Sequence, residues 1–131
     1  MKDIKTILVT GGAGFIGSEL VRHLLNSSNH YVVNVDKLTY SGNLQSLESI
    51  ESSSRYLFEK IDICDANEFH RVLVERKPDT IIHLAAESHV DRSIDGPSEF
   101  IQTNIFGTYN ILEQTKNYWQ SLQGEKKDNF R

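Results

Sequence analysis

The 131-residue sequence predicts an α/β fold in which a parallel sheet is covered by helices on both faces. Short apolar runs rich in valine and isoleucine alternate along the chain with segments whose apolar residues recur at helical spacing. The runs are almost continuously apolar, which is typical of parallel strands buried on both faces. Strand, helix and strand in series therefore predict a doubly wound, Rossmann-like sheet. We expect an incomplete version of it, with about four strands in the order 3-2-1-4.

The predicted strands are short runs enriched in β-branched and aromatic residues, as is usual for buried strands. The first three runs are followed directly by a threonine or an aspartate, and this change of polarity marks their ends. The four runs are residues 4–9, 31–35, 56–61 and 80–84.

Helical spacing of apolar residues predicts one helix after the first strand and another after the third, around residues 16–24 and 69–76. Pro78 stops the second of these helices, because proline cannot continue a helix. A short helix is also expected around residues 44–50.

The last part of the chain is predicted to be a loop followed by one long helix. The loop spans residues 85–97, and the helix spans residues 98–122 with Ser98 as its N-cap. The polar stretch 124–131 is expected to form a surface loop or a frayed end.

Composition excludes several classes of function. The net charge of −4 argues against a nucleic-acid partner, because proteins that bind the phosphate backbone are usually basic. Cys64 is the single cysteine, so no internal disulfide can form. No apolar run approaches the roughly 20 residues of a membrane span, and no signal peptide is visible. We expect a soluble, cytoplasmic protein with no nucleic-acid or membrane partner.

A glycine-rich loop, Thr10-Gly-Gly-Ala-Gly-Phe-Ile-Gly17, lies between the first strand and the first helix. Gly11, Gly14 and Gly17 permit a tight turn and let a pyrophosphate approach the backbone. The start of the helix offers unpaired N–H groups and a partial positive charge to the same anion. The loop therefore predicts a dinucleotide-binding site.

Asp36 ends the second strand about 20 residues after this loop, where a doubly wound fold places its ribose-binding acid. A carboxylate accepts hydrogen bonds from the 2′- and 3′-hydroxyls of adenosine but repels a 2′-phosphate, so NAD is favoured over NADP. Lys37 follows directly and would soften that preference.

Asp62 follows the third strand in a corresponding position, and its carboxylate is suited to accept a hydrogen bond from the adenine amino group. Asp65 is the expected N-cap of the next helix. His83 lies in an apolar run and is interpreted as a hydrogen-bonded core residue, and His89 as a structural loop residue. Neither histidine has partners at metal-ligand spacing, so no metal site is predicted.

These motifs together resemble the amino-terminal half of the dTDP-glucose 4,6-dehydratases, a family of the extended short-chain dehydrogenase/reductase superfamily. The glycine loop identifies only the superfamily. The stretch from Glu87 to Ile94 is far more specific, and it argues against the related epimerases. The segments that carry the resemblance are residues 10–17, 36–43, 62–65, 83–94, 103–104 and 107–108.

The resemblance implies a role for each matching residue. Phe15 and Ile16 would line the pyrophosphate, and Asp62 and Ile63 would hold adenine. Ser88 would also face the sugar nucleotide. The residues around the adenosine ribose would be Asp36, Lys37, Leu38 and Thr39, and those at the nicotinamide end Leu84, Ala85, Ala86, Glu87, Ser88 and Thr103.

The catalytic residues of the family are not found where the fold requires them. The superfamily uses Tyr-x-x-x-Lys on a later helix, and the dehydratases add an Asp-Glu pair. Tyr56 and Lys60 match the first spacing, but on a strand four residues span about 13 Å, too far for the lysine to lower the tyrosine pKa. We therefore assign no catalytic residue and expect this chain alone to have no dehydratase activity.

The leading interpretation is that residues 1–131 are the NAD-binding portion of a lyase that converts dTDP-glucose to dTDP-4-keto-6-deoxyglucose. A fragment of a UDP-sugar epimerase or decarboxylase, or a non-catalytic NAD-binding module, are the alternatives. Because the family forms homodimers, self-association is also expected. It would use either the exposed edge of residues 80–84 or the long helix over residues 98–122.

Overall fold

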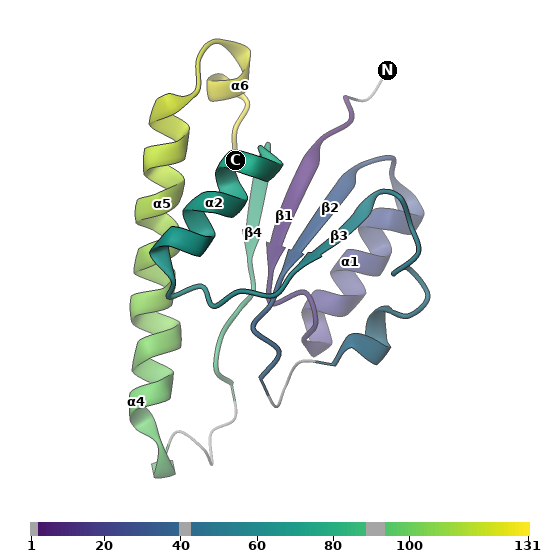
Figure 1. Ribbon diagram of the computed structural model, residues 1–131. Coiled ribbons are helices and arrows are strands. Elements are labelled where there is room, and N and C mark those ends of the chain that lie inside the picture. Colours follow the sequence, from purple (N-terminus) through teal and green to yellow (C-terminus); the bar gives the residue numbers. More distant parts are fainter. Residues whose placement is uncertain (1–2, 40–42, 89–93) are drawn as a thin grey trace.

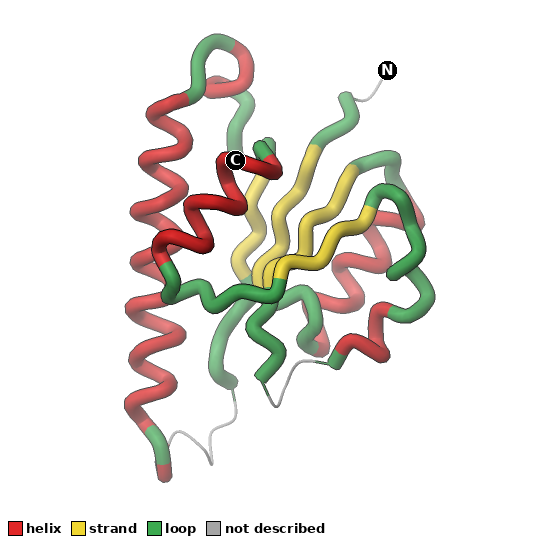
Figure 2. The backbone as a smooth tube through the Cα atoms, viewed as in Figure 1, coloured by secondary structure: helices red, strands yellow, loops and turns green. Residues whose placement is uncertain are grey.

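The computed structural model describes residues 3–39, 43–88 and 94–131, and these form a four-stranded sheet covered by helices on both faces (Figures 1 and 2). All neighbouring strands are parallel, and their order is β3-β2-β1-β4. This confirms the predicted α/β class and strand order. The strands are β1 (Thr6–Thr10), β2 (Tyr31–Val35), β3 (Tyr56–Glu59) and β4 (Thr80–His83).

Alternate strand residues supply the two apolar cores, one on each face of the sheet. Leu8 of β1 packs with helix α2 (Ala66–Arg76) and helix α5 (Thr108–Ser121). Ile7 and Val9 point the other way, toward α1 (Phe15–Ser27) and the 3₁₀-helix η1 (Leu44–Leu47). The continuous apolar strands are thus explained by burial on both faces.

Helix α2 begins and ends at residues with the expected chemistry. The Asp65 carboxylate accepts a hydrogen bond from the Glu68 N–H at 3.0 Å, which confirms Asp65 as the N-cap. Lys77 ends the helix in a left-handed conformation with a φ of 49°, and Pro78 follows. The chain then turns directly into β4.

The long helix predicted over residues 98–122 exists, but it begins earlier and is not uniform. It comprises α4 (Pro97–Phe100), the π-helix η2 (Ile101–Gly107) and α5. The prediction of Ser98 as N-cap is wrong, because Gly96 caps the helix and Pro97 occupies its first turn. Proline suits that position, since its missing N–H would have no partner there.

The end of the chain is more ordered than the sequence suggested. Residues 124–131 include a short helix, α6 (Glu125–Asp128), and the Arg131 N–H and C=O pair with Asp79 and Ile81 along the outer edge of β4. The Phe130 ring packs edge-on against Tyr118, with centroids 5.8 Å apart. Residues 124–131 lie at the surface as expected, but the predictions that they form only a loop or a frayed end and that the β4 edge is unpaired are wrong, because Phe130 packs on Tyr118 and Arg131 pairs with the edge. Among the described residues, no helix is both long and apolar enough to cross a membrane.

Candidate functional site

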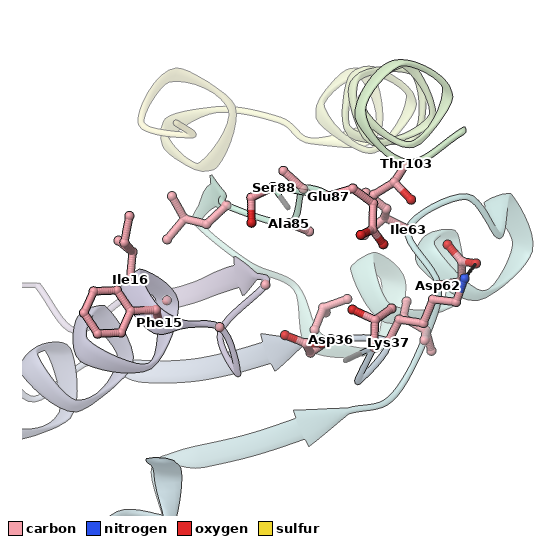
Figure 3. Close-up of a pocket in the computed structure, with 18 residues that line it drawn as sticks. Phe15, Ile16, Asp36, Lys37, Asp62, Ile63, Ala85, Glu87, Ser88 and Thr103 are labelled. Atoms are coloured by element: carbon pink, nitrogen blue, oxygen red, sulfur yellow. Dashed lines mark ion pairs between the residues drawn. The ribbon is translucent and has the colours of Figure 1, made fainter. Parts of the chain in front are cut away.

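A cavity of about 540 Å³ opens at the carboxyl ends of the strands, where ligands of doubly wound sheets bind (Figure 3). Nearly all of the predicted site residues line it. From the glycine loop and the ends of β2 and β3 come Gly11, Gly14, Phe15, Ile16, Gly17, Val35, Asp36, Lys37, Thr39, Ile61, Asp62 and Ile63. From the segment after β4 and the long helix come Leu84, Ala85, Ala86, Glu87, Ser88 and Thr103.

The glycine loop is a tight turn in which a side chain at either of two positions, Gly11 and Gly17, would collide with backbone atoms. Gly11 has a φ of +73°, and a Cβ there would lie 2.7 Å from the Ala85 backbone nitrogen. A Cβ on Gly17 would lie 2.0 Å from the Gly11 carbonyl oxygen. The start of α1 is thereby packed directly on the loop, and no side chain caps it. The first N–H groups of α1 are thus available to an anion in the cavity.

Asp36 is held in place by the backbone on both sides of it. One carboxylate oxygen accepts the Ala13 N–H at 3.0 Å, and the other accepts the Leu38 N–H at 2.7 Å. A carboxylate has about four acceptor sites, so two remain for a ligand. Asp36 therefore ties the end of β2 to the glycine loop and places negative charge on the cavity wall.

Lys37 and Asp62 form an ion pair across the ends of β2 and β3, with Nζ and Oδ2 3.0 Å apart (Figure 3). This hydrogen bond to Asp62 is the main reason that the pKa of Lys37 is raised. Burial acts to raise the pKa of Asp62, but the Cys64 N–H and Lys37 outweigh burial and lower it. Both groups are thus charged at neutral pH.

The segment after β4 is attached to β1 through Thr10. The Thr10 hydroxyl oxygen accepts the N–H groups of Leu84 and Ala85 at 3.1 and 3.2 Å. Its proton is therefore directed to His83 Nδ1, 2.6 Å away. Nε2 then carries the histidine proton and donates to the Thr108 hydroxyl at 3.0 Å. His83 is hydrogen-bonded, as predicted, but it is half-buried and not a core residue, and burial lowers its pKa.

Two asparagines of the long helix hold the cavity segments, and sequence reasoning missed both. Asn104 accepts the Glu87 N–H at 2.8 Å and donates to the Glu87 carbonyl at 3.0 Å. Asn110 donates to the Ile63 carbonyl at 2.6 Å. These hydrogen bonds join residues far apart in sequence, so no local pattern indicates them.

Leu38 is the one predicted site residue that does not line the cavity. Its side chain packs against the apolar cluster beneath α1, because Leu38 has a φ of 59° that turns the chain after Asp36. Val35 and Ile61 line the cavity although they were not predicted. Each directly precedes a predicted acidic residue, so the strand ends offered a signal that was overlooked.

The remaining predicted features are consistent with structural roles. The Tyr56 hydroxyl accepts a hydrogen bond from the buried Asn34 side chain, and burial raises the tyrosine pKa, the opposite of what a catalytic tyrosine needs. Within residues 3–39, 43–88 and 94–131, no cluster of three metal-ligating side chains occurs. Part of the resemblance, residues 40–42 and 89–93 including His89, lies outside the described residues.

Comparison with known proteins decides the family. The family model described as GDP-mannose 4,6 dehydratase matches residues 8–130. The chain belongs to this family. A dTDP-glucose 4,6-dehydratase of Shigella flexneri is 61% identical over 125 residues, which are 95% of this chain and 35% of that protein. The resemblance to the dTDP-glucose 4,6-dehydratases is thus confirmed, and this family member spans about a third of the length of the curated relatives it matches.

Solved structures agree with this placement in the dehydratase family. The dTDP-glucose 4,6-dehydratase of Streptomyces venezuelae, solved with NAD bound, is 45% identical with a TM-score of 0.82, over 86% of this chain and 36% of that one. A UDP-glucose 4-epimerase of Thermotoga maritima is 36% identical with a TM-score of 0.77, over 86% of this chain and 34% of that one. The fold is shared with epimerases, but the higher identity favours the dehydratases.

Proposed function

We propose that this chain binds NAD in the cavity at the carboxyl ends of its strands, as the NAD-binding portion of a dTDP-glucose 4,6-dehydratase. The observation that carries the proposal of NAD binding is the placement of Asp36. Its carboxylate is fixed by two backbone N–H groups on the same wall as the uncapped start of α1. An anion-binding helix end beside an acid suits a pyrophosphate joined to an unphosphorylated ribose.

The size and lining of the cavity fit the same ligand. Its volume of about 540 Å³ is within the range of small-molecule sites, and it is lined by residues from the ends of all four strands or the segments after them. Relatives of this chain from Streptomyces venezuelae and Bacillus anthracis were solved with NAD bound. In a dehydratase, NAD supplies the temporary hydride acceptor.

Calorimetry with NAD and NADP tests the proposal. NAD is expected to bind more tightly, and Asp36→Ala should weaken NAD binding about tenfold by removing a charge-assisted hydrogen bond. The same change should also reduce the difference between the dissociation constants of NAD and NADP. Glu51→Ala removes an exposed carboxylate outside the cavity and serves as the control. Tighter binding of NADP by the unmodified chain would overturn the proposal.

The parent activity is proposed on the same basis. Within a longer protein, the cavity would hold NAD for the conversion of dTDP-glucose to its 4-keto-6-deoxy product. Ser88 lies exposed at the cavity, with its hydroxyl available to the sugar nucleotide (Figure 3). An epimerase or decarboxylase fragment, and a non-catalytic NAD module, would bind NAD through the same residues, so the dehydratase assignment depends on the relatives and not on Asp36.

We further propose that the chain self-associates through its long helix. Six large apolar residues along that helix are between 40% and 64% exposed: Ile101, Ile105, Phe106, Tyr109, Leu112 and Trp119. An exposed apolar stripe of this kind is typical of an interface between subunits. The β4 edge is the weaker alternative, since Arg131 already pairs with part of it.

Light scattering at tens of micromolar measures this association. The unmodified chain is expected to be dimeric or larger, and a variant with both Ile105→Glu and Leu112→Glu to be monomeric. Asn117→Glu adds charge at an exposed polar position of the same helix and should leave the association unchanged. A monomeric unmodified chain would contradict the proposal.

A further inference from the structure

The position of Lys37 creates a question about cofactor choice. It directly follows Asp36, and both residues line the cavity at the end where we propose that an adenosine ribose binds. In sites of this fold that accept NADP, a cation near this point binds the 2′-phosphate. A free ammonium here would therefore offset the preference that Asp36 creates.

The ammonium of Lys37 is not free, because it extends to Asp62 at the end of β3 (Figure 3). Asp62 is itself fixed: Oδ1 accepts the Cys64 N–H at 2.9 Å, which leaves Oδ2 to contact Lys37 Nζ at 3.0 Å. The charge of Lys37 is thus compensated by a carboxylate from the neighbouring strand end.

We propose that Asp62 is a specificity-determining residue, which favours NAD over NADP by holding the Lys37 ammonium away from the 2′-position of the bound adenosine. The inference rests on the proposed NAD site. Asp36 repels a 2′-phosphate directly, whereas Asp62 acts by withdrawing the ammonium of Lys37, a cation on the cavity wall that would attract one.

The size of the effect follows from the exposure of the pair. The side chains of Lys37 and Asp62 are 58% and 37% exposed, so water and salt screen their attraction. Exposed pairs of this kind change an equilibrium by about two- to fivefold. Asp62 therefore adds a small contribution to the preference for NAD over NADP, and Asp36 makes the larger one.

The test measures the dissociation constants of NAD and NADP and uses their ratio, NADP over NAD. Both dinucleotides carry the same adenine, so the removal of a hydrogen bond between Asp62 and adenine cancels in the ratio. Asp62→Asn should lower the ratio about two- to fivefold, because the released ammonium attracts the 2′-phosphate. The amide oxygen still accepts the Cys64 N–H, and a thermal melt checks that the fold is retained.

Repeating the Asp62→Asn measurement in a chain that also carries Lys37→Met shows whether Asp62 acts through Lys37. In that background Asp62→Asn should leave the ratio unchanged, since no ammonium remains to be released. An equal drop with and without Lys37 would overturn the proposal, because Asp62 would then repel the phosphate directly. An unchanged ratio in the Asp62→Asn single variant would also overturn it. If the unmodified chain binds neither dinucleotide, it is the proposed NAD site that fails.

Discussion

The wall of the cavity formed by the glycine loop is held by close packing of backbone on backbone, whereas the wall formed by residues 84–88 is held largely by hydrogen bonds to side chains of other elements. On the first wall, Gly17 packs on the Gly11 carbonyl, and Asp36 binds two backbone N–H groups. On the second wall, the Leu84 N–H donates to the Thr10 carbonyl, and the side chains of Thr10 and Asn104 make further hydrogen bonds to Leu84, Ala85 and Glu87. The first wall therefore depends on how closely backbone atoms pack, and the second depends more on hydrogen bonds to side chains.

This difference predicts how each wall responds to mutation. Close packing of backbone on backbone cannot be relieved by rotating a side chain, so an added methyl group must displace the chain itself. A side-chain hydrogen bond can be broken while the segment stays near its place. A substitution in the first wall should therefore lower the unfolding free energy strongly, whereas a substitution in the second wall should lower it less and leave the fold in place.

The largest effect is expected for Gly17→Ala compared with Gly107→Ala. The new Cβ of Gly17→Ala would lie 2.0 Å from the Gly11 carbonyl oxygen, and we expect a loss of about 3 kcal/mol in unfolding free energy. At Gly107 the nearest atom, 2.6 Å away, is the movable end of the Ile63 side chain. The higher helix propensity of alanine offsets that clash, so a loss of about 1 kcal/mol or less is expected there. Urea unfolding measures the unfolding free energy of both variants. Equal losses in the two variants would contradict the expectation that Gly17 is the more sensitive position.

An intermediate effect is expected for Asn104→Ala. It removes the two hydrogen bonds that Asn104 makes to the N–H and C=O of the buried Glu87, at a cost of about 1–3 kcal/mol. NAD binding should weaken as well, because Glu87 lines the cavity. Asn104→Asp keeps an acceptor for the N–H and should recover part of the stability, while Asn117→Ala, exposed on the same helix, is the control. Stability equal to that of the unmodified chain would show that Asn104 does not hold this wall.

The smallest effect concerns the pH dependence of the second wall. Burial lowers the pKa of His83, so its contribution to stability is present above the unfolded-state pKa and is lost as the pH falls through the folded-state pKa. Protonation would place a hydrogen on Nδ1, which accepts the Thr10 hydroxyl in the folded state. The unmodified chain should therefore lose stability as the pH falls below about 6.5, the unfolded-state pKa, and through the lower folded-state pKa.

His83→Asn provides the comparison for this prediction. Its amide oxygen can accept the Thr10 hydroxyl in place of Nδ1, but it does not titrate. Urea midpoints measured across the same pH range should fall less steeply for His83→Asn than for the unmodified chain. If the urea midpoints of the two proteins fell equally steeply with pH, His83 would not be the cause of the pH dependence.

The sequence by itself determined the class of the fold, the strand order and most of the cavity. Continuous apolar runs predicted buried parallel strands, and the glycines together with Asp36 and Asp62 marked strand ends that meet at one edge of the sheet. These features depend on local composition and on the handedness of strand–helix–strand units, both of which can be read from the sequence.

Tertiary structure alone decided which distant groups meet. Leu38 turns into the core because its positive φ follows from the turn after Asp36, and Arg131 reaches β4 because Phe130 packs on Tyr118. The pairing of Lys37 with Asp62, and of Asn104 with Glu87, likewise joins segments that only the packed sheet and long helix bring together. A polar side chain has many potential partners along the chain, and local patterns do not distinguish among them until packing brings one within hydrogen-bonding distance.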